Sequence, residues 1–308
     1  MKLTSKLLIL AAAAFAIICF TGCSNFNVYN NADKYDPGNR DVSSEIEELD
    51  IDWSSGEVSV SRHDLSTISI VETCSDKLEP SEQVHSWVDG KTLRIHFAKS
   101  GEMFFFGSPK KKLEIKIPKD MSFKDIRLDG SSCDSRFEAV KADHIYADVS
   151  SGNVNIIDCS AKTFDVDTSS GDTKIVQLGE SDSISVDCSS GSVDIKAEKV
   201  SKLRLDTSSG KVESDIKECA DVRADTSSGD VTLEFGNVPD KSSIDTSSGD
   251  VKIFLPKEAE FTAEVDTSSG EFYTDFSCTS KGDSHVCGDG SGKFSIDTSS
   301  GDIEFRKK

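Results

Sequence analysis

Basic and aromatic residues are scarce in this chain of 308 residues. Lysine and arginine number 35 against 55 aspartates and glutamates, which gives a formal charge of −20 at pH 7. Nucleic acids and anionic lipids are bound through basic patches that displace counterions, so this balance argues against both as partners of the folded part. Aromatic residues make up 7% of the chain, which argues against a thick globular core and allows only a thin one.

The motifs of the common enzyme classes are also missing. The sequence has no Walker loop, no dinucleotide-binding glycine motif and no HExxH of the zinc proteases. The phrase DTSSG resembles the Asp-Thr-Gly of aspartic peptidases, but its extra serine breaks that spacing. The cysteine spacings match no zinc site, and the histidines lie apart from any nucleophile motif. The sequence therefore predicts a non-catalytic protein with no resident cofactor.

Long apolar runs are missing except near the N-terminus. LLILAAAAFAIICF at 7–20 follows two lysines, and about fourteen residues are too few to span the roughly 30 Å of hydrocarbon in a bilayer. The overlapping stretch FTGC at 20–23 resembles the lipobox of bacterial lipoproteins. This pattern predicts a lipoprotein signal peptide over 1–22 and acylation of Cys23, which would anchor the exported protein at the outer face of the cytoplasmic membrane or at the cell surface. The alternative is ordinary cleavage and secretion, which leaves Cys23 a free thiol.

One six-residue phrase is abundant instead. DTSSGD occupies 225–230, 245–250 and 297–302, and close variants recur about every 20 residues, as in stacked repeat proteins. Around each copy apolar and polar residues alternate, which is typical of strands with one buried face. SSG between two such runs predicts a tight turn in which glycine supplies a positive φ. The position of this glycine is filled in turn by Gly56, Cys133, Gly152, Gly171, Gly191, Gly210, Gly229, Gly249, Gly270 and Gly301.

These features predict an all-β protein whose main part is a parallel β-solenoid with 19–20 residues per rung. Crossovers between parallel strands favour a right-handed solenoid, and an antiparallel meander is the alternative. Residues 23–43, polar and without periodicity, predict a flexible tether. Residues 44–120 predict a β-rich cap on the first rung, and 121–308 the solenoid itself. The glycine-rich insert CTSKGDSHVCGDGSG at 278–292 predicts a loop near the end of the rod.

The parity of the alternation separates inward from outward positions in the phrase. Its threonine is expected to point inward and to stack as a ladder, with Cys188 in the same place in one rung. Its aspartates are expected to point outward, about 4.8 Å from the copies in adjacent rungs. They predict either solvated turns or a weak site for divalent cations, Ca²⁺ in preference. The aspartates concerned are Asp167, Asp172, Asp206, Asp225, Asp230, Asp245, Asp250, Asp266, Asp297 and Asp302.

Two smaller features stand outside the repeat. Phe104, Phe105 and Phe106 form a run between glycines, and they predict either a contribution to the cap core or an exposed contact with a partner or membrane. Cys278 and Cys287 lie close enough in sequence for a disulfide that closes a small loop, while the other cysteines of the folded part are expected to be small core residues.

The repeated phrase, the lipobox leader and the segments ELDIDWSSGEVSV and LEIKIPKDMSFKDIRLDGSS resemble the bacterial DUF4097 family, whose members are β-strand-repeat proteins labelled putative adhesins. The resemblance covers 44–308. It implies an extracytoplasmic β-solenoid that is often membrane-anchored and sometimes linked to envelope-stress signalling. It implies no enzymatic activity.

The expected function is therefore non-catalytic. A lipid-anchored solenoid would present a repetitive, acidic, hydroxyl-rich face to an envelope protein or glycan, for adhesion or for envelope sensing. The alternative is a carbohydrate-active β-helix enzyme that acts on polysaccharide. Such an enzyme would need a groove with clustered carboxylates and aromatic subsites, and the repeats contain few aromatic residues.

Overall fold

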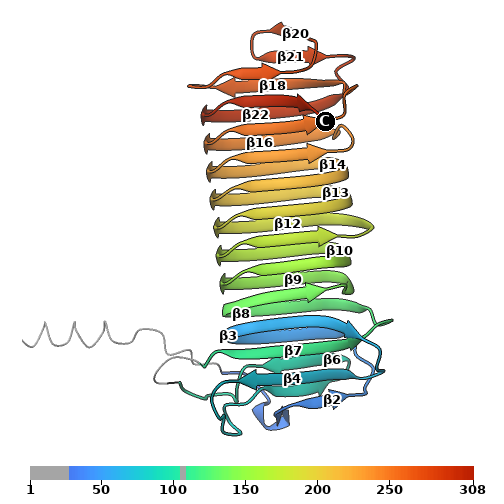
Figure 1. The fold of residues 1–308 in the computed structure, drawn as a ribbon, viewed down its shortest axis with the longest axis vertical. Helices are drawn as coiled ribbons and strands as arrows, with labels where there is room; N and C mark the ends of the chain where they lie inside the picture. The colour runs from blue at the N-terminus through green and yellow to red at the C-terminus, as the bar shows by residue number, and fades with distance from the viewer. Residues whose placement is uncertain (1–27, 105–108) are drawn as a thin grey trace, which may run out of the picture.

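The chain folds into a rod of stacked strands with a smaller cap at one end (Figure 1). This computed structural model describes residues 28–104 and 109–308. No helix in these residues is long and apolar enough to cross a membrane. Cys23, Phe105 and Phe106 lie outside the described residues.

The rod is built from coils of the chain that pair in parallel, and each coil is called a rung here. Copies of the phrase stack in register from rung to rung, so that Asp187 pairs with Asp206 and Cys188 with Thr207. The prediction of a parallel β-solenoid is confirmed. Its strands are β8 (Phe123–Glu138), β9 (Lys141–Ser151), β10 (Val154–Ser170), β11 (Thr173–Gln177), β12 (Glu180–Ser190), β13 (Val193–Ser209), β14 (Val212–Ser228), β15 (Val231–Phe235), β16 (Lys241–Ser248) and β17 (Val251–Leu255).

The core of the rod is thin and follows the predicted parity. Buried and exposed residues alternate along each strand, and Phe164, Val166 and Thr168 are all inside. The threonine ladder is confirmed in the other rungs by the buried Thr207, Thr226, Thr246 and Thr298, with Cys188 buried in the same column. Thr267 of the last rung is only half-buried.

Beyond the rung of Cys133, the corner after each Ser-Ser pair leaves no room for a side chain. Gly191 has a φ of 147°, which L-residues rarely adopt. A Cβ added there would lie 2.0 Å from the carbonyl oxygen of Gly171 in the adjacent rung. Close backbone contact with the adjacent rung therefore requires glycine at Gly191 and at the equivalent glycines of the other rungs.

The second rung carries the phrase in an altered form, DGSSC, with glycine in the threonine column and Cys133 in the glycine column. A Cβ added to Gly130 would lie 2.7 Å from the Cys133 Sγ atom. The thiol, which is almost fully buried, thus fills the space that a threonine would occupy.

The cap begins with a rung of its own. Strand β3 pairs in parallel with β8, and its Trp53, in the threonine column, is fully buried against Phe97 at 4.9 Å between ring centroids. Antiparallel pairs of strands β4–β7 and β5–β6 complete the cap. Its elements are a 3₁₀ turn η1 (Ala32–Lys34), β1 (Asp36–Pro37), β2 (Arg40–Val42), β3 (Glu48–His63), β4 (Ile68–Cys74), β5 (His85–Asp89), β6 (Thr92–His96) and β7 (Lys111–Pro118).

Most of the predicted tether over 23–43 is folded, which corrects that prediction from residue 29 onward. The Tyr29 ring stacks on His96 with centroids 3.8 Å apart, and its hydroxyl donates to the Ala98 carbonyl at 3.0 Å. Tyr35 and Val42 are buried, and β1 and β2 pair with β5 and β4. The prediction of a tether rests on the lack of periodicity in this segment. Its few apolar side chains nevertheless find partners at the end of the cap.

The opposite end of the rod departs from the order of the sequence. Strands β22 (Gly292–Ser300) and β23 (Ile303–Lys307) form a rung that lies between β16–β17 and the rung of β18 (Phe261–Thr267) and β19 (Phe272–Thr274). The insert predicted as a loop forms a hairpin of β20 (Cys278–Lys281) and β21 (Ser284–Cys287), and β21 pairs antiparallel with β18 (Figure 1). The glycines of the insert lie at its turns, where Gly282, Gly288 and Gly290 adopt positive φ, and they do not interrupt either strand.

Candidate functional site

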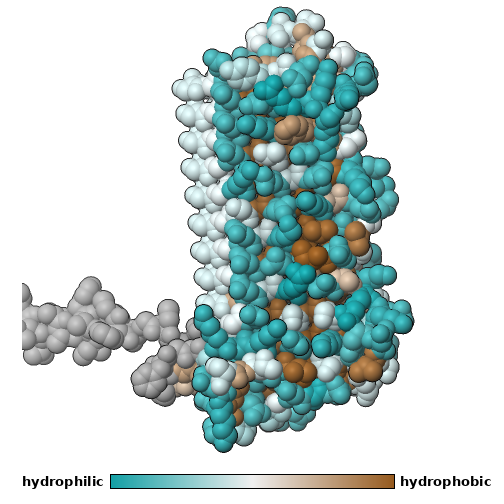
Figure 2. Space-filling view, viewed as in Figure 1, coloured by the Kyte–Doolittle hydropathy of each residue, from teal (hydrophilic) through white to brown (hydrophobic). Residues whose placement is uncertain are grey.

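A continuous edge of serines runs along the rod and is called the serine edge here. Each rung from β8 onward contributes two successive exposed serines, and the pairs stack because the rungs are in register. Figure 2 shows this edge as a pale column, between hydrophilic and hydrophobic in colour, along one side of the rod. It consists of Ser131 and Ser132, Ser150 and Ser151, Ser169 and Ser170, Ser189 and Ser190, Ser208 and Ser209, Ser227 and Ser228, Ser247 and Ser248, Ser299 and Ser300, and Ser268 and Ser269.

On one side of the serine edge lies a row of outward aspartates, the first aspartate file. Its members pair with one another across adjacent rungs, so like charges follow each other up the rod. The file contains Asp129, Asp148, Asp167, Asp187, Asp206, Asp225, Asp245, Asp297 and Asp266. Arginines neutralise two of them locally: Arg127 Nε is 2.8 Å from Asp129, and Arg223 Nε is 2.6 Å from Asp225.

Crowding in the first file alters the acidity of its members. Partial burial raises the pKa of Asp167, and the neighbouring Asp148 and Asp187 carboxylates raise it further. Partial burial and the adjacent Asp187 and Asp225 likewise raise the pKa of Asp206. The fold therefore keeps these like charges close together, and their mutual repulsion disfavours the charged form of each carboxyl group.

On the other side of the corner lies a second aspartate file with a different chemistry. Each Oδ1 atom accepts a hydrogen bond from the backbone N–H of the same position in the adjacent rung. Asp172 accepts from Ser192 at 2.8 Å, and Asp230 accepts from Asp250 at 3.0 Å. The other acceptors and donors are Asp134 with Asn153, Asn153 with Asp172, Asp250 with Asp302, and Asp302 with Glu271.

The predicted site residues thus divide into two groups. Asp172, Asp230, Asp250 and Asp302 connect rungs through backbone groups that no strand partner satisfies. The remaining six belong to the exposed first file. Among residues 28–104 and 109–308 there is no group of three or more His, Cys, Asp or Glu side chains arranged to hold a metal ion.

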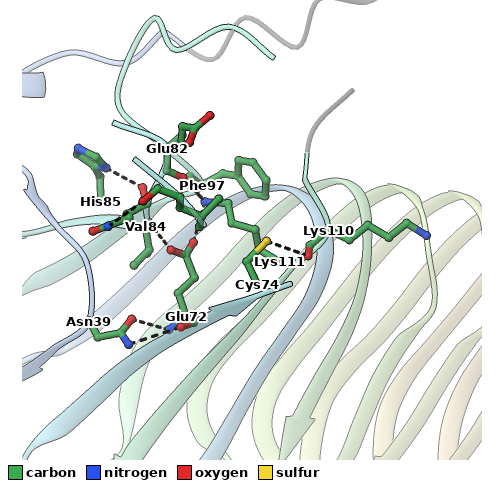
Figure 3. Close-up of polar contacts among 12 residues, drawn as sticks. Asn39, Glu72, Cys74, Glu82, Val84, His85, Phe97, Lys110 and Lys111 are labelled. Atoms are coloured by element: carbon green, nitrogen blue, oxygen red, sulfur yellow. Dashed lines mark hydrogen bonds and ion pairs between the residues drawn. The ribbon is translucent and has the colours of Figure 1, made fainter. Parts of the chain in front are cut away.

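The cap contains a buried ion pair that sequence reasoning missed (Figure 3). Lys111 pairs with Gly56 in the glycine column, and its side chain is fully buried. Its Nζ atom lies 2.7 Å from Glu72 Oε1, donates to the Glu82 carbonyl at 2.6 Å and also donates to the Phe97 carbonyl. Neighbouring Lys110 extends away from this cluster.

The surroundings of Lys111 are apolar as well as polar. Its Nζ atom lies 3.9 Å from the centroid of the Phe97 ring and 5.3 Å from that of Trp53. The Glu72 side chain is 5% exposed, and its second oxygen accepts from the Val84 N–H at 3.0 Å. Burial lowers the pKa of the Lys111 ammonium group. The run KKK concealed this lysine, because its partners come from segments distant in the sequence.

A shallow groove of about 610 Å³ opens beside this cluster at the foot of the serine edge. Lys110 and Lys112 on its rim are matched by Glu57 and Asp134, so the groove does not favour a ligand of one charge sign. Phe104 packs against Phe97 with centroids 5.7 Å apart, which places it at the cap core.

The cysteines of the described residues are mostly internal. Cys278 and Cys287 form a disulfide across the β20–β21 hairpin. Cys133, Cys159 and Cys219 are buried, and burial raises the pKa of each thiol to about 11 or 12. Such thiols are poor nucleophiles at neutral pH, which fits a packing role.

In-register rungs, a serine edge and a β-rich cap define a solenoid repeat protein. The model of the Toastrack DUF4097 family matches residues 46–306, and the chain belongs to this family. No curated protein matches the chain.

Several solved structures are similar to the chain at low identity. A putative adhesin from Parabacteroides merdae ATCC 43184 is 12% identical, with 88% of this chain and 96% of that chain covered and a TM-score of 0.47. A putative adhesin from Bacteroides fragilis NCTC 9343 is 13% identical, with 87% and 95% covered and a TM-score of 0.45. A putative cell adhesion protein from Clostridium sporogenes ATCC 15579 is 11% identical, with 89% and 100% covered and a TM-score of 0.28.

Proposed function

We propose that the protein is a non-catalytic envelope protein, lipid-anchored through Cys23, that presents its serine edge and first aspartate file to an extracellular partner for adhesion or envelope sensing. The observation that carries this proposal is the division between the two files. The second file is used within the fold, whereas the serine edge and most of the first file are directed to solvent along the whole rod. A repeated surface of this kind suits a repetitive partner, such as a glycan or an envelope polymer, because many weak contacts add through multivalency.

The repetition also argues against catalysis at this edge. An active site needs carboxylates whose surroundings separate their pKa values, so that one acts as acid and the other as base. In the first file the pKa values of Asp167 and Asp206 are both raised, and for the same reasons.

Surface binding can be tested with beads that carry the mature protein, applied to envelope preparations of the host bacterium and to a glycan array. The triple variant Ser189→Lys, Ser208→Lys, Ser227→Lys places bulky charges on the serine edge and should lose most of the binding. The matched control Ser122→Lys, Ser201→Lys, Ser295→Lys changes three exposed serines elsewhere and should retain it. Equal binding by the two triple variants would contradict a role for the serine edge.

Anchoring is tested separately by fractionation of cells. Cys23→Ala should release the protein from membranes, because acyl chains supply the expected membrane affinity. Cys19→Ala, inside the expected signal peptide, is the matched control and should leave the protein in the membrane fraction. Release by neither substitution would contradict an anchor at Cys23.

A further inference from the structure

Two C-terminal segments carry the same phrase between two strands. Residues 261–274 form β18–β19 and residues 292–307 form β22–β23, and each contains DTSSG between two short strands. The segment that comes later in the sequence occupies the earlier place in the stack.

The pairing pattern shows that these two segments are equivalent in register. Ser295 of β22 pairs with Ser243 on one side and with Glu264 on the other. Thr298 likewise pairs with both Thr246 and Thr267. Strand β18 could therefore pair directly with β16 in place of β22, and Ser243 would then lie beside Glu264.

Packing explains why β22 occupies the position next to β16, which is called the slot here. Gly292 is buried beside Val238, and a Cβ added there would lie 2.3 Å from the Val238 Cγ1 atom. The corresponding residue of β18 is Phe261, which pairs with Gly292. A phenyl ring fits this position poorly, so the slot selects the segment that carries glycine.

The observed order also closes the end of the rod. The hairpin strand β21 pairs antiparallel with β18 and covers its outer edge. In the sequential order β22 would be outermost, with no hairpin of this kind on its edge. Uncovered parallel edges are sites of edge-to-edge association between chains.

We propose that the C-terminal rung is an exchangeable latch: residues 292–307 intercalate to close the end of the rod, and residues 261–274 take the same slot when intercalation fails. Residues 261–274 leave the ribosome first, so the sequential stack is available to them before the C-terminal rung exists. The last segment then displaces them. The sequential stack is the open form, whose bare edge can pair with a second copy of the chain.

Engineered disulfides in the full mature chain distinguish the two orders. Adjacent strands lie about 4.8 Å apart and second neighbours about 9.6 Å, whereas a disulfide needs Cα atoms within about 7 Å. The pair Ser243→Cys, Ser295→Cys should therefore cross-link in the closed form. The pair Ser243→Cys, Glu264→Cys should cross-link only in the open form. Mass spectrometry of digested protein assigns each bridge despite the native cysteines.

The decisive comparison adds Phe294→Asp to the second pair, because Phe294 is buried and a carboxylate in its place expels β22 from the slot, whereas β18 brings Ala263 to the same position. We expect the 243–264 bridge to rise from near absence to the major product. Ser295→Asp, which puts the same side chain on the outer face of the same strand, is the matched control and should leave the bridge absent. If Phe294→Asp yields no 243–264 bridge, whether because the closed form persists or because the rung frays, the latch is refuted.

Discussion

The two aspartates of one phrase behave differently in this rod. Partial burial and the like charges of its row raise the pKa of Asp206 in the first file, whereas Asp250 of the second file accepts a hydrogen bond from a backbone N–H of the adjacent rung. The residue type is the same, but the second position lies at the corner, where a backbone donor lacks a strand partner. The position of a carboxylate relative to the corner therefore decides whether it stabilises or destabilises the stack of rungs.

Variation among the rungs supports this division. The second file accommodates Asn153, whose amide oxygen makes the same bond, and Ser192 and Lys211 interrupt it. The first file keeps an aspartate in every rung from Asp129 to Asp297, although it gains little within the fold. We infer that the first file serves contacts outside the chain or keeps rods apart by repulsion.

The largest effect is expected for the Glu72 carboxylate, which, unlike the carboxylates of the two files, is 5% exposed and paired with a buried lysine. Lys111→Met removes the partner of Glu72 and leaves a buried charge, and unpairing of this kind costs about 3–5 kcal/mol. Urea denaturation of Lys111→Met and of the control Lys110→Met, whose side chain points away, should show this loss only for the former. Similar midpoints for the two variants would contradict the role assigned to Lys111.

A smaller but still severe effect is expected at the corner that separates the files. Gly191→Val combines a strained φ with a contact to the backbone of Gly171, and should cost more than about 2 kcal/mol. Ser189→Val, on the exposed edge two residues earlier, should change stability by less than about 0.5 kcal/mol. The measurement is chemical denaturation, and a tolerated valine at 191 would overturn the corner geometry.

The threonine ladder should be far more tolerant. Thr246 is buried, and its hydroxyl has no hydrogen-bond partner among the described residues. Thr246→Val keeps the shape and removes a buried polar group, so the free energy of unfolding should stay the same or rise by up to about 1 kcal/mol. Calorimetry of this variant checks the expectation, and a marked loss of stability would indicate that the hydroxyl has a partner.

The smallest effect concerns pH and the first file. Because the pKa of Asp206 is raised in the folded state, protonation favours folding, and this group's contribution to stability is lost as pH rises through that folded pKa. Asp206→Asn should therefore raise the melting temperature at pH 7 by on the order of 1 °C. The gain should vanish below about pH 4, where the unfolded carboxyl is protonated as well. A gain that is independent of pH would contradict the electrostatic explanation.

Cation binding to the first file can be tested with added calcium. At fixed ionic strength, millimolar Ca²⁺ should raise the melting midpoint above that in NaCl if the aspartates bind cations. The variant Asp225→Asn, Asp245→Asn should remove any difference. Equal midpoints in the two salts would leave the first file as a solvated row of charge.

Period-two alternation and the spacing of the phrase were sufficient to predict the rungs, their register and the inward threonines. The different role of Asp250 could not be predicted, because it depends on which backbone N–H is left without a partner at the corner. Lys111 was missed because Glu72 and Phe97 approach it only after folding. The intercalated C-terminal rung was hidden by repetition itself, since 261–274 and 292–307 offer the same pairing groups.

The same substitution in each file tests the division between them most directly. Thermal melts at pH 7 and low salt should be compared for Asp206→Ala and Asp250→Ala. The account predicts opposite signs: Asp206→Ala relieves repulsion and leaves the midpoint unchanged or higher, whereas Asp250→Ala loses the bond to the Asp302 N–H and lowers it. Equal lowering of both midpoints would contradict the claim that only the second file holds the rungs together.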